Sequence, residues 1–304
     1  MTYAVVSDIH GNYPALKAIM ADAQMNGAHH FIFLGDYTNS IPFQNEVTET
    51  IRTLPNKTVI RSNHENYLID FRDKPPVIPV PAFSLPLWWS YCRHTPENLD
   101  YLFNLPSIEQ ISNSIFLSHS VDTFFSPEHI MPFYPSHYKR KMEDEPFTHA
   151  AYLRIAAESI RSCPDAMANI RKLPKGVYLF GHNHLQFNAE IEGRLFVNPG
   201  SCGFPLDFDT RAAYSLLTRI DSNRWKVTER RVDYDKSEVF DAMRQTGFSE
   251  ECPEFGAIYT KLLETGSDYL GLFIQHIQNT ARMIGNDNPF GCAVWRQAIA
   301  SFQF

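Results

Sequence analysis

The sequence has few cysteines, and none of them are closely paired. Five cysteines are spread over 304 residues with no C-x-x-C motif, namely Cys92, Cys163, Cys202, Cys252 and Cys292. An odd, dispersed set argues against a disulfide framework and against a thiolate zinc site. It fits a reducing compartment, so we expect a cytoplasmic protein.

Long apolar runs and an excess of basic charge are also missing. No run reaches the length of a membrane-spanning helix, and Asp8 interrupts the N-terminus before a signal-length stretch develops. The net charge of −7 argues against nonspecific nucleic-acid binding and against a polybasic membrane anchor. A small phosphorylated substrate remains compatible, because a bound dication would supply positive potential locally.

Apolar and aromatic residues, at 44% and 13%, are ample for a large core. The first part of the chain alternates strand-like and helix-like patterns, which predicts a largely parallel sheet. Residues 212–218 and 225–232 alternate like antiparallel strands, and we expect them to complete a second sheet. The other expected strands span 3–7, 31–34, 58–61, 114–118, 177–180 and 195–198, and the early helices span 14–26 and 44–54.

Two stretches interrupt this alternation, and we describe the chain as a domain over 1–234 with insertions at about 74–110 and 121–165. Five prolines between Lys74 and Tyr91 predict neither a regular strand nor a helix interior there. We expect the aromatic residues of that segment to pack against the sheet in preference to stacking on a nucleobase: Phe83, Trp88, Trp89 and Tyr91. The second insertion carries a basic cluster, Lys139, Arg140 and Lys141, and a helix near 149–162.

Residues 235–304 have helical periodicity throughout and form an expected C-terminal extension. Its helices could cover the sandwich, close a lid, or form a dimer contact, and the sequence leaves these three roles open.

Side chains of the metal-ligating type follow the expected strands, each just beyond the strand's carboxyl end. In an open α/β sheet, ligand sites gather along that edge. His182 and His184, two apart in an extended segment, are expected to face one centre, and Gly181 leaves room for the sharp bend before them. The full set is Asp8, His10, Asp36, Asn63, His119, His182 and His184.

Seven ligands exceed the needs of one tetrahedral ion. Two carboxylates would partly offset two dications, and Asp36 could bridge the ions through its two oxygens. Paired ions about 3.5–4 Å apart suit displacement at phosphorus. Mixed nitrogen and oxygen donors favour Mn, Fe, Co or Zn over Mg, so we expect two divalent metal ions.

As an ordered set, these motifs resemble the calcineurin-like metallophosphoesterase family. The resemblance covers roughly residues 1–234 and rests on Asp8-x-His10, Gly35-Asp36, Asn63-His64-Glu65, His119 and Gly181-His182-x-His184. More narrowly, two segments resemble the compact bacterial phosphodiesterase branch: Asp8-Ile9-His10-Gly11-Asn12 and Asn198-Pro199-Gly200-Ser201-x-Gly203.

The resemblance implies a four-layer α-β-β-α sandwich with two mixed sheets. It also implies that Asp36 bridges two metals, between which a hydroxide attacks phosphorus in line. His64 would be catalytic, binding a phosphoryl oxygen or protonating the departing one, and Glu65 is expected to orient it. The remaining ligands divide between the first metal (Asp8, His10 and His184) and the second (Asn63, His119 and His182).

The sequence also departs from the family. Ser62 replaces the usual glycine before Asn63-His64, and residues 38–41 lack the arginine of the protein serine/threonine phosphatases. We therefore expect a binuclear phosphoesterase acting on a phosphodiester or a small phosphorylated or nucleotide substrate. The alternatives are a diadenosine-polyphosphate or nucleotide hydrolase and a protein phosphatase. A noncatalytic interaction scaffold is disfavoured, because every ligand position keeps a coordinating side chain.

Overall fold

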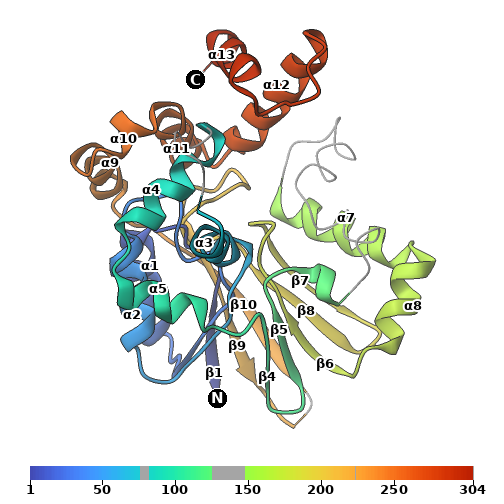
Figure 1. Ribbon diagram of the computed structural model, residues 1–304. Coiled ribbons are helices and arrows are strands. Elements are labelled where there is room, and N and C mark those ends of the chain that lie inside the picture. The colour runs from blue at the N-terminus through green and yellow to red at the C-terminus, as the bar shows by residue number, and fades with distance from the viewer. Residues whose placement is uncertain (76–81, 125–147, 223, 304) are drawn as a thin grey trace.

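The computed structural model describes residues 1–75, 82–124, 148–222 and 224–303. Two five-stranded mixed sheets pack face to face between layers of helices, as predicted (Figure 1). The first sheet has the order β10-β9-β1-β2-β3 and the second β4-β5-β6-β8-β7. The strands are β1 (Thr2–Val6), β2 (His30–Phe33), β3 (Lys57–Val59), β4 (Ile108–Ile111), β5 (Ile115–Ser118), β6 (Gly176–Leu179), β7 (Gln186–Ile191), β8 (Arg194–Pro199), β9 (Ala212–Arg219) and β10 (Trp225–Val232).

The helices cover the outer faces of the sheets and continue into the C-terminal part of the chain (Figure 1). They are α1 (Tyr13–Met25), α2 (Gln44–Thr53), α3 (Asn63–Asp73), α4 (Leu85–Arg93), α5 (Pro96–Phe103), α7 (His149–Arg161), α8 (Pro164–Lys172), α9 (Lys236–Gln245), α10 (Phe248–Glu251), α11 (Pro253–Thr265), α12 (Tyr269–Met283) and α13 (Cys292–Ser301), with short 3-10 turns η1 (Ala82–Ser84) and η2 (Val121–Thr123). None of the described helices is long and apolar enough to cross a membrane.

Strand β1 shows how the period-two pattern builds the layers. Tyr3 and Val5 belong to the apolar cluster between the two sheets, whereas Ala4 and Val6 belong to the cluster under the helices of the first sheet. Both sets are buried, because successive side chains of a strand point to opposite faces. A buried strand of this kind fixes the position of the residues that follow it.

Strands β9 and β10 do not complete the second sheet, and that prediction was wrong. Strand β9 pairs antiparallel with β1, with Thr2 opposite Thr218, so both strands extend the first sheet. Alternation of apolar and polar residues indicates antiparallel pairing but does not identify the partner strand. The second sheet instead gains the hairpin of β4 and β5.

The segment Leu87-Trp88-Trp89-Ser90-Tyr91 is helical, contrary to the prediction for this proline-rich stretch. Pro86 lies in the first turn of α4, where its missing N–H costs no intrahelical hydrogen bond. Trp89 is buried and packs edge-on against Phe248, and Trp88 stacks on Tyr91. These aromatic residues therefore pack among helices and not against a sheet.

Helices α9–α13 enclose an apolar cluster of their own. Phe273, Ile277 and Val294 are completely buried in it, which agrees with the helical periodicity expected for residues 235–304. Phe204, from the loop after β8, and Trp89, from α4, belong to the same cluster, so the helices also contact the sandwich. The division of the chain near residue 234 remains a prediction.

Candidate metal centre

All of the predicted ligands follow strand ends, and the facing sheets bring six of them, all except Asn63, into two adjoining groups. Asp8 and His10 follow β1, Asp36 follows β2, and Asn63 begins α3 after β3. His119 follows β5, and both His182 and His184 follow β6. The carboxyl ends of these strands point to one edge of the sandwich, which is where sites in open α/β sheets form.

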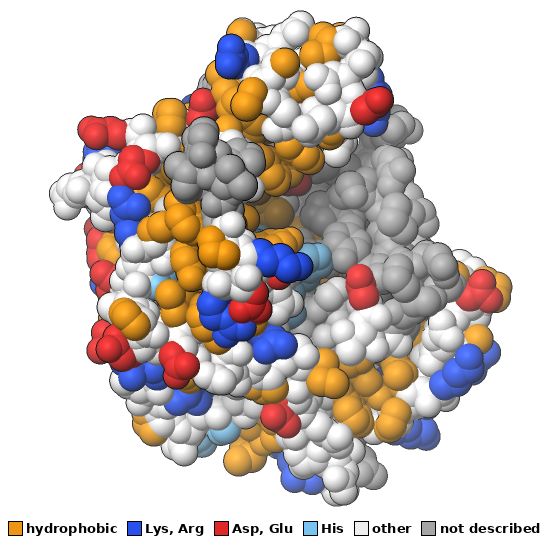
Figure 2. Space-filling model, in the orientation of Figure 1, with side chains coloured by type: hydrophobic (Ala, Val, Ile, Leu, Met, Phe, Trp, Pro, Cys, Tyr) orange, Lys and Arg blue, Asp and Glu red, His pale blue; other side chains and the backbone are white. Residues whose placement is uncertain are grey.

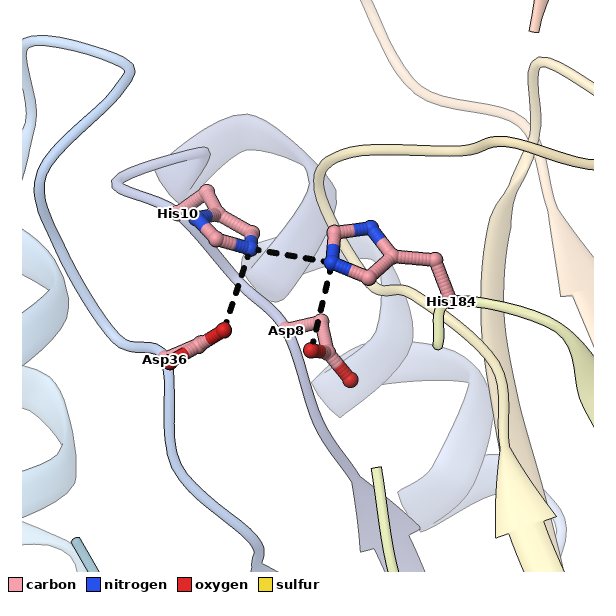
Figure 3. Close-up of side chains that lie close together, drawn as sticks. All are labelled: Asp8, His10, Asp36 and His184. Carbon is pink, nitrogen blue, oxygen red and sulfur yellow. Dashed lines mark hydrogen bonds and ion pairs between the residues drawn. The ribbon is translucent and has the colours of Figure 1, made fainter. Parts of the chain in front are cut away.

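Asp8, His10, Asp36 and His184 form the first group, and their side chains point toward one another in Figure 3. His10 Nε2 lies 3.3 Å from His184 Nε2 and 3.5 Å from Asp36 Oδ2. His184 Nε2 lies 3.4 Å from Asp8 Oδ1. All four are buried, and nitrogen and carboxylate atoms at this spacing suit a divalent cation.

The second group shares Asp36 with the first and adds His119 and His182. His119 Nε2 lies 3.4 Å from Asp36 Oδ2 and 3.3 Å from His182 Nδ1. One oxygen, Oδ2, thus faces both groups. We had expected both oxygens of Asp36 to do so, but Oδ1 accepts a hydrogen bond from the Ser62 hydroxyl.

Five of these residues have left-handed backbone conformations, which are uncommon outside glycine. The φ angles are 54° at Asp8, 53° at His10, 56° at Asp36, 75° at His182 and 60° at His184. His182 and His184 are therefore not in an extended segment, contrary to prediction, whereas their placement in different groups agrees with the division between two metals that the resemblance implies. Such strain persists only where surrounding contacts hold it, and it gathers at functional sites.

Backbone hydrogen bonds supply those contacts by joining the strand-end loops. The N–H groups of Ile9 and His10 both donate to the carbonyl of Asp36, at 2.8 Å each. The Gly181 N–H donates to the carbonyl of His119 at 2.8 Å, and the His182 N–H to Asp8 Oδ1 at 3.1 Å. The loops from both sheets thus form one rigid unit.

Carbonyl groups fix the orientation of two imidazoles. His119 Nδ1 donates to the carbonyl of Leu34 at 2.7 Å, and His184 Nδ1 donates to that of Phe204 at 2.6 Å. Because a carbonyl only accepts, the proton must stand on Nδ1 when the ring is neutral. The lone pair of Nε2 then points into the centre, as in metal-ligating histidines generally.

Burial and mutual proximity shift the pKa values of the cluster. Burial, reinforced by nearby His64, lowers the pKa of His10 well below its usual value, and burial also lowers that of His182. Burial would raise the pKa of Asp36, but His119 and His64 hold it well below its usual range. Burial opposes the charged form of His119, yet Asp36 raises the pKa of His119 to about 9. The Asp36 carboxylate thus stays ionised and the imidazoles of His10 and His182 stay neutral, which is the form that binds metals, whereas His119 must lose a proton to do so.

Asn63 offers a further oxygen atom that could bind a metal ion. Its Oδ1 is buried and accepts no hydrogen bond among the described residues. A buried polar atom without a partner is costly unless a ligand satisfies it. This oxygen is therefore available to a metal ion, which is the role that the resemblance implies for Asn63.

Glu65 does not orient His64, and that prediction was wrong. Its buried carboxylate accepts from the backbone N–H groups of Ser62, Asp36 and Tyr37 at 2.9, 3.2 and 2.9 Å. Ser62 caps α3 in a capping box with Glu65. The serine that departs from the family pattern thus clamps the Asp36 loop to the start of α3.

His64 lies at the edge of the centre, with Nε2 4.0 Å from Asp36 Oδ2 and its side chain one-fifth exposed (20%). Its Nδ1 has no partner among the described residues. Asn39 donates to its backbone carbonyl at 3.0 Å. His64 is thus held by its backbone while its ring faces the open side.

The segment from Asn198 to Gly203 supports the centre without contributing a ligand. Asn198 donates to the carbonyl of Gly181 at 2.8 Å, and the Ser201 hydroxyl donates to that of Asp8 at 2.8 Å. Residue types alone did not reveal these supporting roles, although the Asn198-Pro199-Gly200-Ser201 motif marked the segment. The basic cluster Lys139, Arg140 and Lys141 lies outside the described residues.

Fold and site together define a metal-dependent hydrolase of the α/β sandwich class. The family described as calcineurin-like phosphoesterase matches residues 1–186. The chain therefore belongs to this family, whose members hydrolyse phosphoesters with a dinuclear metal centre.

The chain is similar to proteins from several organisms. An uncharacterised protein of Methanocaldococcus jannaschii is 25% identical over 245 residues, covering 78% of this chain and 90% of the relative. A metallophosphoesterase of Sphaerobacter thermophilus superposes with a TM-score of 0.59 at 22% identity, covering 84% of this chain and 98% of the other. A hypothetical protein of Pyrococcus horikoshii gives 0.58 at 22%, covering 88% and 98%. The two structures share the fold of this chain.

Proposed function

We propose that this protein hydrolyses phosphodiesters or other small phosphorylated substrates at a centre of two divalent ions. The observation that carries the proposal is Asp36, whose Oδ2 faces two separate groups of ligands. Asp8, His10 and His184 would hold one ion, and His119, His182 and Asn63 the other. Asp36 would contact both.

When bound, the ions supply a Lewis acid for the phosphoryl oxygen and lower the pKa of a coordinated water to about 7. The chain supplies the rest. His64 stands at the open side of the centre, where its imidazole can hydrogen-bond a phosphoryl oxygen or donate a proton to the departing oxygen. The clamp of Ser62 and Glu65 holds the start of α3, and with it His64, against the Asp36 loop.

Two features favour a diester over a monoester. The ordered motifs resemble those of compact bacterial phosphodiesterases. No lysine or arginine is among the described residues that line the cleft over the centre, so a singly charged diester needs less compensation than a dianionic monoester. A nucleotide or diadenosine polyphosphate remains the alternative substrate.

Three further proposals concern the metals, the cellular location and the oligomeric state. Imidazole-rich mixed donors support Mn, Fe, Co or Zn as the metals. The five free cysteines support a cytoplasmic location. Exposed Met283 and Ile284 at the end of α12 support a dimer contact through the C-terminal helices.

The proposal is tested by hydrolysis of bis-p-nitrophenyl phosphate. We expect Mn²⁺ to stimulate turnover, chelation to abolish it, and Asn63→Ala to remove it while the fold is retained. Asn66→Ala, on the exposed side of the same helix, is the matched control and should keep wild-type activity. Full activity in the chelated protein would contradict the metal mechanism.

His64→Ala separates catalysis from metal binding. We expect the rate to fall about 10²- to 10⁴-fold, the range for general acid–base groups, while the metal content stays at the wild-type level. Loss of metal in proportion to the loss of rate would instead identify His64 as a ligand.

A further inference from the structure

A cleft of about 500 Å³ opens over the candidate centre, and it is much larger than the phosphoryl group requires. His10, His64 and His184 line its floor. Figure 2 shows the hollow, with histidine and neighbouring Lys or Arg side chains at its lower edge and hydrophobic side chains to its left and above it. A volume of this size is typical of sites that enclose a small organic ligand.

The walls come from parts of the chain outside the strand-end loops. Helix α3 and the segment from Phe83 to Leu87 form one side, and Phe204 and Leu206 form another. Helices α11 and α12 close the cleft with Phe255, Tyr259 and Leu270. The C-terminal helices therefore lie against the same space that the ligand groups face.

Aromatic rings run without interruption from the centre to the outer wall. The ring centroid of Phe204 lies 5.0 Å from that of His10 and 5.2 Å from that of Tyr259. The ring centroid of Tyr259 lies 5.8 Å from that of Phe255, and the Phe255 and Phe83 centroids are 6.3 Å apart. A group attached to a phosphorus atom at the centre would therefore meet an apolar surface.

Charge on these walls is sparse and of one sign. Besides the histidines, Asp70 and Asp268 are the charged members of the described lining, and no lysine or arginine is among them. Asp268 is occupied as the cap of α12, because its Oδ1 accepts from the Gly271 N–H at 2.8 Å. Among the described residues of these walls, a second anionic group of a substrate would find no cation, and its desolvation there would be costly.

We propose that this cleft binds the organic group of the substrate and selects an uncharged, ring-sized apolar group; the inference rests on the proposed function. The C-terminal helices thereby contribute to specificity, because Phe255, Tyr259 and Leu270 supply part of the wall. A polyphosphate chain is disfavoured, since its additional charges would lie against apolar and acidic side chains.

The test compares two esters with the same leaving group, p-nitrophenyl phenylphosphonate and p-nitrophenyl methylphosphonate. Both are monoanions, so they differ chiefly in the ring that the cleft would bury. After correction for their rates of alkaline hydrolysis, we expect kcat/KM to be at least about tenfold higher for the phenyl ester. A ratio near one would overturn the inference.

Two substitutions in different walls locate the effect. Leu270→Ser on α12 and Phe83→Ala on η1 should each reduce the phenyl-to-methyl ratio to about threefold or less. Leu272→Ser, two residues from Leu270 but 46% exposed, is the matched control and should keep the wild-type ratio. An unchanged ratio in both wall variants would overturn the inference, and using two variants guards against one that fails to fold.

A binding measurement separates this inference from the proposed function. Calorimetry of the Mn²⁺-loaded protein should give a dissociation constant about tenfold lower for phenylphosphonate than for methylphosphonate. If neither ester is hydrolysed but phenylphosphonate keeps that advantage, the proposed function fails and the apolar cleft stands. Equal dissociation constants would overturn the cleft assignment whether or not hydrolysis occurs.

Discussion

The strand-end loops of the candidate centre and the C-terminal helices differ in what holds them in place. In the loops, Asp8, His10 and Asp36 keep left-handed backbones because hydrogen bonds join one loop to the next. In the helices, Phe273 and Ile277 are completely buried among other apolar side chains.

Hydrogen-bonded loops of this kind accept few replacements, because each polar atom is bound to particular partners in a particular geometry. An apolar core tolerates substitutions that conserve volume. The molecule thus combines a candidate metal centre that tolerates few substitutions with C-terminal helices that tolerate more of them. We expect substitutions in the loops to alter metal binding, and substitutions in the helices to alter stability and substrate choice.

Asp36→Asn tests the loops most severely. The amide keeps the size of the side chain but loses the charge that faces both ligand groups. We expect the metal content to fall and kcat/KM to drop by more than about a hundredfold, since even the partners of ligands cost 10- to 100-fold. Circular dichroism should show a retained fold, and near-normal turnover would contradict the shared role of Asp36.

Phe273→Ala tests the helices. Removing this fully buried ring should lower the free energy of unfolding by about 3–5 kcal/mol, while the metal content of the folded protein stays at the wild-type level. Leu272→Ala, at an exposed neighbouring position, is the control and should change stability by less than about 0.5 kcal/mol. If Phe273→Ala also removed the metals, the two regions would not be separable.

Gly181→Ala tests how closely the loops approach one another. A Cβ at this position would lie 2.0 Å from Ser7 Oγ and 2.8 Å from Asp8 Oδ2. Gly181 is therefore required because Ser7 and Asp8 approach its Cα closely. From the sequence we had expected only a bend in the backbone as the reason. We predict a loss of about 1–3 kcal/mol in the free energy of unfolding together with weaker metal binding.

Gly27→Ala is the control for that substitution. Nothing lies within 4 Å of its added Cβ, but its φ of +78° makes alanine strained. It should lose roughly 1 kcal/mol of stability and keep its metals. Equal loss of metal in both variants would indicate a general effect of replacing glycine.

The pH dependence of the metal-free protein gives the smallest expected effect. Asp36 raises the pKa of His119 to about 9, above the unfolded value of about 6.5. The charged pair therefore stabilises the metal-free fold fully below pH 6.5, and this contribution is lost as the pH rises towards 9. Thermal melts in chelator should show this decline, and His119→Asn should lack it.

Metal binding should have the opposite pH dependence. An ion must displace the proton from His119, so affinity should increase as the pH rises towards 9. Affinity that falls over this range would contradict the assignment of His119 as a ligand.

Most side chains of the candidate centre could be picked out from the sequence, because their residue types and their positions after buried strands are both visible there. Asp36, following the apolar run of β2, is an example. The left-handed backbone at His182 was not predictable from residue type, because the contact that holds it comes from Asp8, 174 residues earlier. The role of Glu65 was missed for the same reason, since it binds the N–H groups of a loop 28 residues upstream.

Two features of the fold could not be predicted from the local sequence. The many prolines argued against helix α4. The helix forms nevertheless, because Pro86 lies in its first turn, where proline is accepted. The alternating pattern of β9 indicated a partly buried antiparallel strand, but its pairing with β1 depends on contacts more than 200 residues apart in sequence. Pairings between distant segments leave no local signal, and only the folded chain shows them.

Metal stoichiometry tests the central claim most directly. Elemental analysis of the protein grown with Mn²⁺ and purified without chelator should find two ions per chain, with anomalous scattering placing one on each side of Asp36 Oδ2. A single ion, or two ions that do not share Asp36, would contradict the account.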